Sequence, residues 1–150
     1  MRSFKNVDEC LLPDKLSDLI EVALKDLSKV EKNPRYVVDM GVWHDDMMEG
    51  VCHVCLAGAV LAGTCKLPHD QVWYPAVINF GSTTSKLIAL DFARRGNLDA
   101  ALRRMGPPPK REDIWFVQRK RWITKQYHID PVMWREQMEQ MVRELRERGL

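Results

Sequence analysis

The stretch WHDDMMEGVCHVCLAGAVLAG, residues 43–63, decides how the rest of this chain is interpreted. It places two histidines and two cysteines directly before a run of small apolar residues. A Cys-x-x-Cys pair in this setting is typical of a metal site, a redox pair, a nucleophile at a helix N-terminus or a packed core. We predict a helix over residues 51–61, ended by Gly63, with Cys52 and Cys55 one turn apart on the same face.

Core packing is the interpretation that this segment favours. Cysteine behaves as a small, readily buried hydrophobe. Five small residues leave the predicted helix with little side-chain bulk, so that its neighbours can approach the backbone closely: Ala57, Gly58, Ala59, Ala62 and Gly63. We therefore expect residues 51–61 to form the central helix of the fold, with Trp43 and His44 packed over its start.

A zinc site is the first chemical alternative, and it would make zinc the cofactor of a protein that otherwise needs none. Cys52 and Cys55 have the spacing of one half of a structural zinc site. Within a single helix, Cys65 would lie roughly 20 Å along the axis from Cys52, which excludes it from the same site. The candidate ligands are therefore Cys52, Cys55 and either His44 or His53, with a fourth from elsewhere such as His128.

Thiol chemistry is the second alternative. A cysteine at a helix N-terminus has its thiolate stabilised by the helix dipole. The preceding acidic residues Asp45, Asp46 and Glu49 would instead raise the pKa of a nearby thiol, and no βαβ pattern precedes the motif. A cysteine nucleophile would also need a histidine base, for which the chain offers His44, His69 and His128. Because no complete catalytic set is visible, we expect a non-enzymatic protein and keep a thiol enzyme as the alternative.

Hydrophobic periodicity predicts a mainly α, single-domain protein over residues 1–150, with about five to six helices around the small-residue central helix. Tyr36–Val38 is expected to form a brief extended piece, and strand signals are otherwise few. Residues 110–150 are an alternative C-terminal helical extension, because Pro107–Pro109 forms a stiff spacer before them. The remaining predicted helices span 13–32, 82–96, 98–105 and 111–126, with a final helix that begins at Asp130–Pro131.

The composition is that of an ordinary globular protein, with 45% hydrophobic and 29% charged residues. A net charge of +2 does not indicate a nucleic-acid-binding polycation. No apolar run approaches the roughly 20 residues that span a bilayer, and no secretory signal is visible. We therefore expect a cytoplasmic protein that does not enter a membrane and whose four cysteines are reduced thiols.

A segment in which basic and aromatic residues alternate follows the triple proline. Such a pattern suits phosphate contacts combined with base stacking, and it suits an acidic protein partner equally well. A solvated helix face is the commoner meaning of the same pattern in a chain of nearly neutral charge. The candidate partner-binding residues are Arg111, Trp115, Arg119, Lys120, Arg121 and Lys125.

The final helix carries methionine and tryptophan at helical spacing. We expect Trp134, Met138, Met141, Val142 and Leu145 to face the core, opposite a solvated face of arginine and glutamate. Adaptable methionines could instead form a homodimer or partner surface.

The pattern Asp39-Met40-x-x-Trp43 followed by Cys52-x-x-Cys55-x-Ala57-Gly58 resembles a family of short uncharacterised bacteriophage and prophage proteins. The resemblance covers about residues 33–65. It carries no catalytic role for Cys52 or Cys55, because the family has no established activity. It implies a phage-encoded protein that binds a host protein or nucleoprotein in the bacterial cytoplasm.

Overall fold

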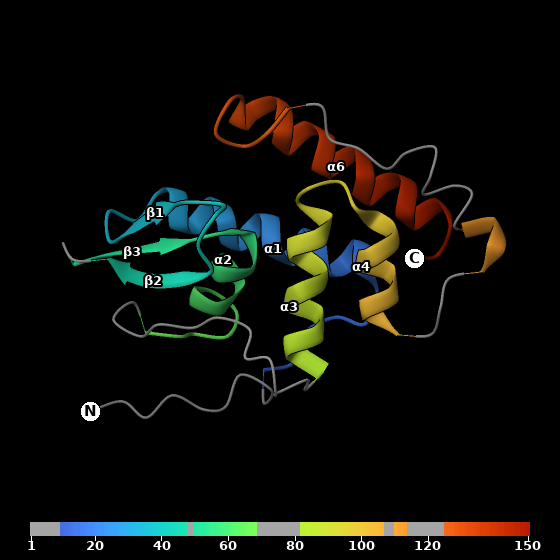
Figure 1. Cartoon of the computed structure of the whole chain (residues 1–150), viewed down its shortest axis with the longest axis horizontal. Helices are drawn as coiled ribbons and strands as arrows, with labels where there is room; N and C mark the ends of the chain where they lie inside the picture. Colours follow the sequence, from blue (N-terminus) through green and yellow to red (C-terminus); the bar gives the residue numbers. More distant parts are fainter. Residues whose placement is uncertain (1–9, 48–49, 69–81, 107–109, 114–124) are drawn as a thin grey trace.

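A computed structural model of the chain describes residues 10–47, 50–68, 82–106, 110–113 and 125–150 (Figure 1). The first helix, α1 (Leu16–Glu31), lies at the centre of this structure and packs against helices from the later parts of the described chain. Its apolar residues recur at three- and four-residue spacing, and this face is buried against four later helices and the first strand of the sheet. The predicted helix over residues 13–32 is therefore confirmed, and it takes the central place that we expected for residues 51–61.

A small three-stranded sheet lies at one end of the molecule (Figure 1). Its strands are β1 (Tyr36–Val38), β2 (His44–Met47) and β3 (Val51–Val54), in the order β1-β3-β2. β3 pairs in parallel with β1 and antiparallel with β2. The chain returns from β2 to β3 through Gly50, whose φ of 73° favours glycine. The fold is thus mainly α with a small sheet, and only β1 was anticipated as an extended piece.

The prediction of one helix over residues 51–61 is wrong in its first half. Val51–Val54 is the central strand, and the helix α2 (Leu56–Ala62) begins only after Cys55. Cys52 and Val54 point into the core while their neighbours are half-buried, which is the two-residue period of a strand. Four residues of alternating burial are too few to be separated by sequence from the start of a buried helix.

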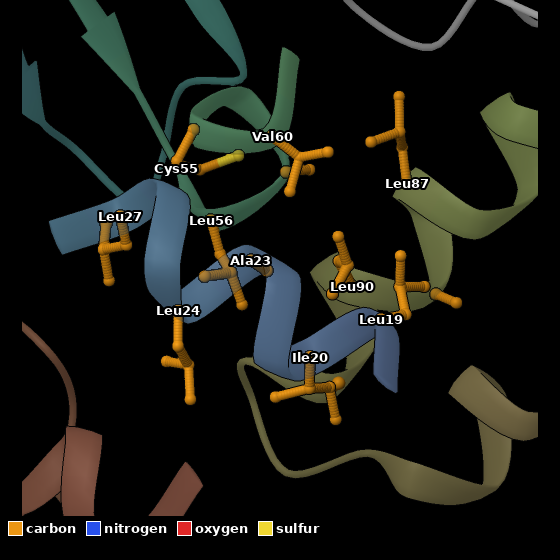
Figure 2. Packing of buried hydrophobic residues seen from close by; sticks show 14 of the residues in the cluster. Leu19, Ile20, Ala23, Leu24, Leu27, Cys55, Leu56, Val60, Leu87 and Leu90 are labelled. Atoms are coloured by element: carbon orange, nitrogen blue, oxygen red, sulfur yellow. The ribbon is translucent and has the colours of Figure 1, made fainter. Parts of the chain in front are cut away.

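Close packing around α2 is confirmed, and its neighbours include the helix α1 as well as the loop before β2. A Cβ atom on Gly58 would lie 1.6 Å from the backbone oxygen of Trp43, and one on Gly63 would lie 2.4 Å from the carboxylate of Asp26. Residues Leu56 to Leu61 are all buried. Figure 2 shows Leu56 and Val60 of α2 in the apolar core with leucines of α1 and α3. Because Gly58 and Gly63 have no side chains, α2 packs directly against the backbone of Trp43 and the buried carboxylate of Asp26.

Helices α3 (Ser82–Ala93) and α4 (Leu98–Met105) pack on each other and close the side of the core away from the sheet. α4 matches its predicted bounds, and the side chain of its predicted cap Asn97 accepts a hydrogen bond from the Ala100 amide. Within the described part of the chain, no helix is long and apolar enough to cross a membrane.

The last helix, α6 (Pro131–Glu147), lies across α1. Asp130 caps it by accepting from the Met133 amide at 3.0 Å, as predicted. The inward face is also as predicted: Trp134, Met138, Met141, Val142 and Leu145 are buried. This helix therefore forms part of the core around α1, although Pro107–Pro109 lies outside the described residues. Met138 and Met141 are buried in that core, so their side chains are not exposed to a second molecule.

The segment before α1 is held to the rest of the structure by a disulfide and by hydrogen bonds. Cys10 and Cys65 form a disulfide, with Cα atoms 5.4 Å apart. Thr83 donates to the Cys10 carbonyl at 2.7 Å, and the buried Lys86 ammonium reaches the Leu12 carbonyl at 2.8 Å. The expectation of four reduced thiols is thus wrong for Cys10 and Cys65, because the turn after α2 brings residues 55 positions apart into contact.

Asp26 is a buried carboxylate that ties α1 to the end of α2. It accepts hydrogen bonds from the Thr64 hydroxyl at 2.6 Å and from the Thr64 amide at 3.2 Å. Burial raises the pKa of Asp26, and the bonds from Thr64 and the charge of Lys29 offset only part of this effect. The ionised form therefore costs folding free energy relative to the protonated form.

This cost predicts a pH dependence that Asp26→Asn should remove. A raised folded-state pKa contributes stability that is full below the unfolded pKa of about 3.9 and is lost as the pH rises through the folded pKa. Relative to Asp26→Asn, the wild-type protein should therefore gain stability as the pH is lowered from 7 toward 4. Urea unfolding of both proteins across this range measures the difference, and a constant difference would contradict the prediction.

Candidate functional site

His44 and Cys52 meet on the buried face of the sheet. The Cys52 sulfur lies 3.5 Å from Nδ1 and 3.6 Å from Nε2 of His44, and both side chains are fully buried. Tyr36 lies beside Cys52 in the strand register and packs edge-on against the His44 ring. Burial, and then the neighbouring Cys52, raise the pKa of Tyr36. The sequence therefore placed one cysteine and one histidine correctly at a common location.

The geometry of this pair is that of a packed contact more than that of an activated thiol. The sulfur is almost equidistant from both ring nitrogens, so that it is not aligned with the in-plane direction of either one. The other proposed bases do not complete the site in the described structure. His128 accepts a hydrogen bond from the Met40 amide at 3.0 Å, and His69 lies outside the described residues.

Cys55 has a separate task as the cap of α2. Its sulfur accepts from the Gly58 amide at 3.4 Å and lies 3.9 Å from the Trp43 carbonyl. Burial raises the pKa of the Cys55 thiol to about 11. The helix start, which should have activated a thiolate, is outweighed here by the removal of the thiol from water.

The zinc hypothesis finds two of its three named ligands in contact, His44 and Cys52, while Cys55 caps the helix. Among the residues that the structure describes, no group of three or more His, Cys, Asp or Glu side chains could hold a metal ion. His53, the other named histidine, faces Asp39 at 3.6 Å on the opposite side of β3. Its Nδ1 atom is buried and has no hydrogen-bond partner within the described structure.

These contacts predict slow thiol chemistry in the folded protein. Iodoacetamide at neutral pH should leave Cys52 and Cys55 unmodified for as long as the protein stays folded, because both sulfurs are buried. Cys10 and Cys65 should also resist alkylation until a reductant is added. Mass spectrometry of digests from native and urea-unfolded samples measures all four sites. Rapid native labelling of Cys52 alone would instead support a thiol enzyme.

Two of the six candidates for the predicted basic and aromatic surface lie in the described residues. Arg111 belongs to the short piece 110–113, and Lys125 lies shortly before α6. Both residues are exposed. Trp115, Arg119, Lys120 and Arg121 lie outside the described residues. Residues 125 and 126 are not helical, so that the predicted helix does not extend to residue 126.

A pocket that the sequence did not reveal lies beside Lys125. Its volume is about 290 Å³, and it is formed by the end of α3, the segment before α6 and the first turn of α6. It is lined by Met40, Arg94, Arg95, Lys125, Gln126, Tyr127, His128 and Trp134. Trp134 donates its indole N–H to the Arg94 carbonyl at 3.2 Å and packs edge-on against Tyr127. These contacts give the pocket a rigid aromatic base.

The pocket is positively charged. Asp91 accepts from Arg94 Nε at 2.8 Å and from Arg95 Nη2 at 3.0 Å, so that one carboxylate is shared by two guanidinium groups. Lys125 makes no ion pair in the described part of the chain. Tyr127 donates to Glu31 at 2.6 Å, and burial together with this bond raises the pKa of its hydroxyl. The three lining cations are therefore only partly neutralised.

Two basic residues of this pocket stand next to each other in the sequence, but such a pair has an ordinary explanation. Arg94 and Arg95 precede Gly96, and basic residues are common at the C-terminal end of a helix. Only the folded chain brings them to Lys125, 30 positions later. The chain matches no protein-family model, no curated protein and no solved structure.

Proposed function

We propose that this protein is a non-enzymatic interaction protein that binds an acidic protein segment at the N-terminal end of α6. The observation that carries the proposal is a group of exposed apolar side chains beside the positively charged pocket. Ile129 and Val132 are 70% and 69% exposed, and Met133 is also exposed. We call these three residues the α6 apolar patch. The resemblance to phage-encoded proteins implies that the partner is a cytoplasmic protein of the bacterial host.

The apolar patch supplies the anchors of such an interface. Isolated exposed apolar residues are normal on a protein surface, whereas neighbouring ones mark interaction sites. The three residues belong to a five-residue segment around the capping Asp130, and the capping bond and Pro131 fix its backbone. A rigid apolar surface loses little conformational entropy when a partner covers it.

Charge decides the chemistry of the partner. The pocket beside the patch presents Lys125, Arg94 and Arg95, with Asp91 as the carboxylate paired with the two arginines. A partner with acidic side chains next to a bulky apolar residue would complement both features. A nucleic acid would match the charge but would not use the apolar patch.

A peptide-display selection against the immobilised protein tests this proposal. Selected peptides should combine Asp or Glu with a bulky apolar residue, and a synthetic peptide of the consensus should bind in a fluorescence-anisotropy titration. The double variant Ile129→Ser/Val132→Ser should weaken that peptide by roughly tenfold or more, because exposed anchors of this kind carry most of the binding energy.

A matched control is the double variant Leu11→Ser/Val37→Ser, which removes two other exposed apolar side chains and should leave the affinity unchanged. The absence of a selected consensus would reject the proposal, and so would equal weakening by both double variants. If a labelled single-stranded oligonucleotide bound tightly and acidic peptides did not, the partner would be a nucleic acid instead.

A further inference from the structure

We propose that the pocket between the end of α3 and the start of α6 binds a phosphomonoester, the phosphate group being held by Arg94. The phosphate can belong to a nucleotide or to a sugar phosphate, and free inorganic phosphate offers the same oxygens to the pocket. This inference rests on the interior of the pocket, and the α6 apolar patch plays no part in it.

Arg94 is the principal residue because its guanidinium is held in place yet incompletely satisfied. Its side chain is only 19% exposed, and its Nε donates to Asp91 at 2.8 Å. Within the part of the chain that the structure describes, no acceptor bonds the two terminal nitrogens. Neither terminal nitrogen is among the buried polar atoms that lack a partner, so both are accessible to a ligand. A phosphate oxygen pair matches this planar fork of donors in a bidentate arrangement.

Charge favours a dianion over a single carboxylate. Arg94, Arg95 and Lys125 line the pocket, and Asp91 neutralises one of these three charges through its shared ion pairs. A phosphomonoester is mostly doubly charged at pH 7.5, because its second pKa is about 6. Two remaining positive charges therefore correspond to the charge of one phosphomonoester group.

Size and the ring side chains point to a small organic carrier for the phosphate. A volume of about 290 Å³ lies at the lower end of the range for small-molecule pockets and leaves room for one compact ligand. The rings of Tyr127 and His128 lie edge-to-face, 5.4 Å apart, at the pocket wall. His128 accepts from the Met40 amide through Nε2, which fixes the orientation of this ring at the pocket.

Isothermal titration calorimetry of the full chain at pH 7.5 and low salt tests the proposal with three probes: inorganic phosphate, ribose 5-phosphate and adenosine monophosphate. At least one should bind with one-to-one stoichiometry, and the order of affinities identifies the carrier. Arg94→Gln should reduce the affinity by about tenfold or more, the usual consequence of losing hydrogen bonds to a charged group. Lys125→Gln should reduce it by about threefold, because its exposed charge is screened by water.

Arg104→Gln is the matched control. Arg104 is an exposed, positively charged residue of α4, and it does not line the pocket. It should leave the affinity within about twofold of the wild-type value, as expected for a solvated charge. Equal losses in Arg94→Gln and Arg104→Gln would overturn the proposal, and so would the absence of binding for all three probes at millimolar concentration.

Two further measurements keep the test independent of folding and of the proposed function. Lys125→Gln alters an exposed side chain, so unchanged phosphate binding in this variant would count against the site even if Arg94→Gln failed to fold. Ile129→Ser/Val132→Ser should leave phosphate binding intact while it weakens peptide binding by roughly tenfold or more. If acidic peptides bind through Arg94 but none of the phosphates does, the pocket recognises a carboxylate, and the phosphate proposal fails while the interaction proposal stands.

Discussion

Gly58→Ala is expected to destabilise the protein by more than about 4 kcal/mol or to prevent folding, well beyond the 1–3 kcal/mol of ordinary overpacking. The added Cβ would lie 1.6 Å from the Trp43 oxygen and 2.8 Å from the Trp43 carbonyl carbon. Both atoms belong to the backbone, so that no side-chain rotation relieves the contact. α2 would have to move away from the start of β2, and the hydrogen bond from the Cys55 amide to Trp43 would be lost.

Helix propensity alone predicts the opposite sign for this substitution. In an unhindered helix, alanine is more favourable than glycine by up to about 1 kcal/mol. Urea unfolding followed by circular dichroism separates the two effects. Gly41→Ala is the matched control, because its Cβ would meet only the Asp39 carboxylate at 3.4 Å, and its effect should stay within about 0.5 kcal/mol. A Gly58→Ala protein as stable as the wild type would refute the close approach of α2 to Trp43.

The helices that sequence could predict have a cap residue, a long apolar period or both. α1 and α6 each repeat their apolar residues over four turns or more, and Asn97 and Asp130 mark the starts of α4 and α6. Each of these signals is local, because it depends on residues within a few positions of one another. The folded protein keeps these helices because their apolar faces pack inward with the same helical spacing that the sequence shows.

The sheet and the pocket depend on contacts that no local pattern contains. β3 is four residues long, and each of its residues that pairs with the parallel strand β1 lies 16 positions after its partner, with β2 between the two strands. In the motif around Cys52 and Cys55, the two-residue period of a strand covers only two buried positions, Cys52 and Val54, before the helix begins. The pocket combines Met40, Arg94 and His128, which only the packing of three separate segments brings together. Sequence thus identified the segment of His44 and Cys52, but not that a strand and a capped helix would separate the two cysteines.

Trp134→Ala is expected to cost about 3–5 kcal/mol, the range for removing a large buried aromatic side chain. Trp134 is the largest fully buried side chain in the described structure, and it lies between the end of α3 and Tyr127. Its removal leaves a cavity in the first turn of α6 and deprives the Arg94 carbonyl of its indole donor. The loss should appear as a lower urea midpoint for unfolding, compared with Met133→Ala, an exposed neighbour whose effect should be within about 0.5 kcal/mol.

Trp134→Phe separates the two parts of this effect. Phenylalanine retains most of the apolar volume and the aromatic edge toward Tyr127 but cannot donate to Arg94, so a cost of about 1–3 kcal/mol is expected from the unsatisfied carbonyl and the smaller ring. If the phenylalanine variant were as unstable as the alanine variant, the hydrogen bond would dominate and the packing argument would fail. If both variants were as stable as the wild type, α6 could not be fastened to the core at Trp134. We expect the stability of Trp134→Phe to lie between those of the wild type and Trp134→Ala. Phenylalanine keeps most of the packing of Trp134, whereas the hydrogen bond to the Arg94 carbonyl is lost completely.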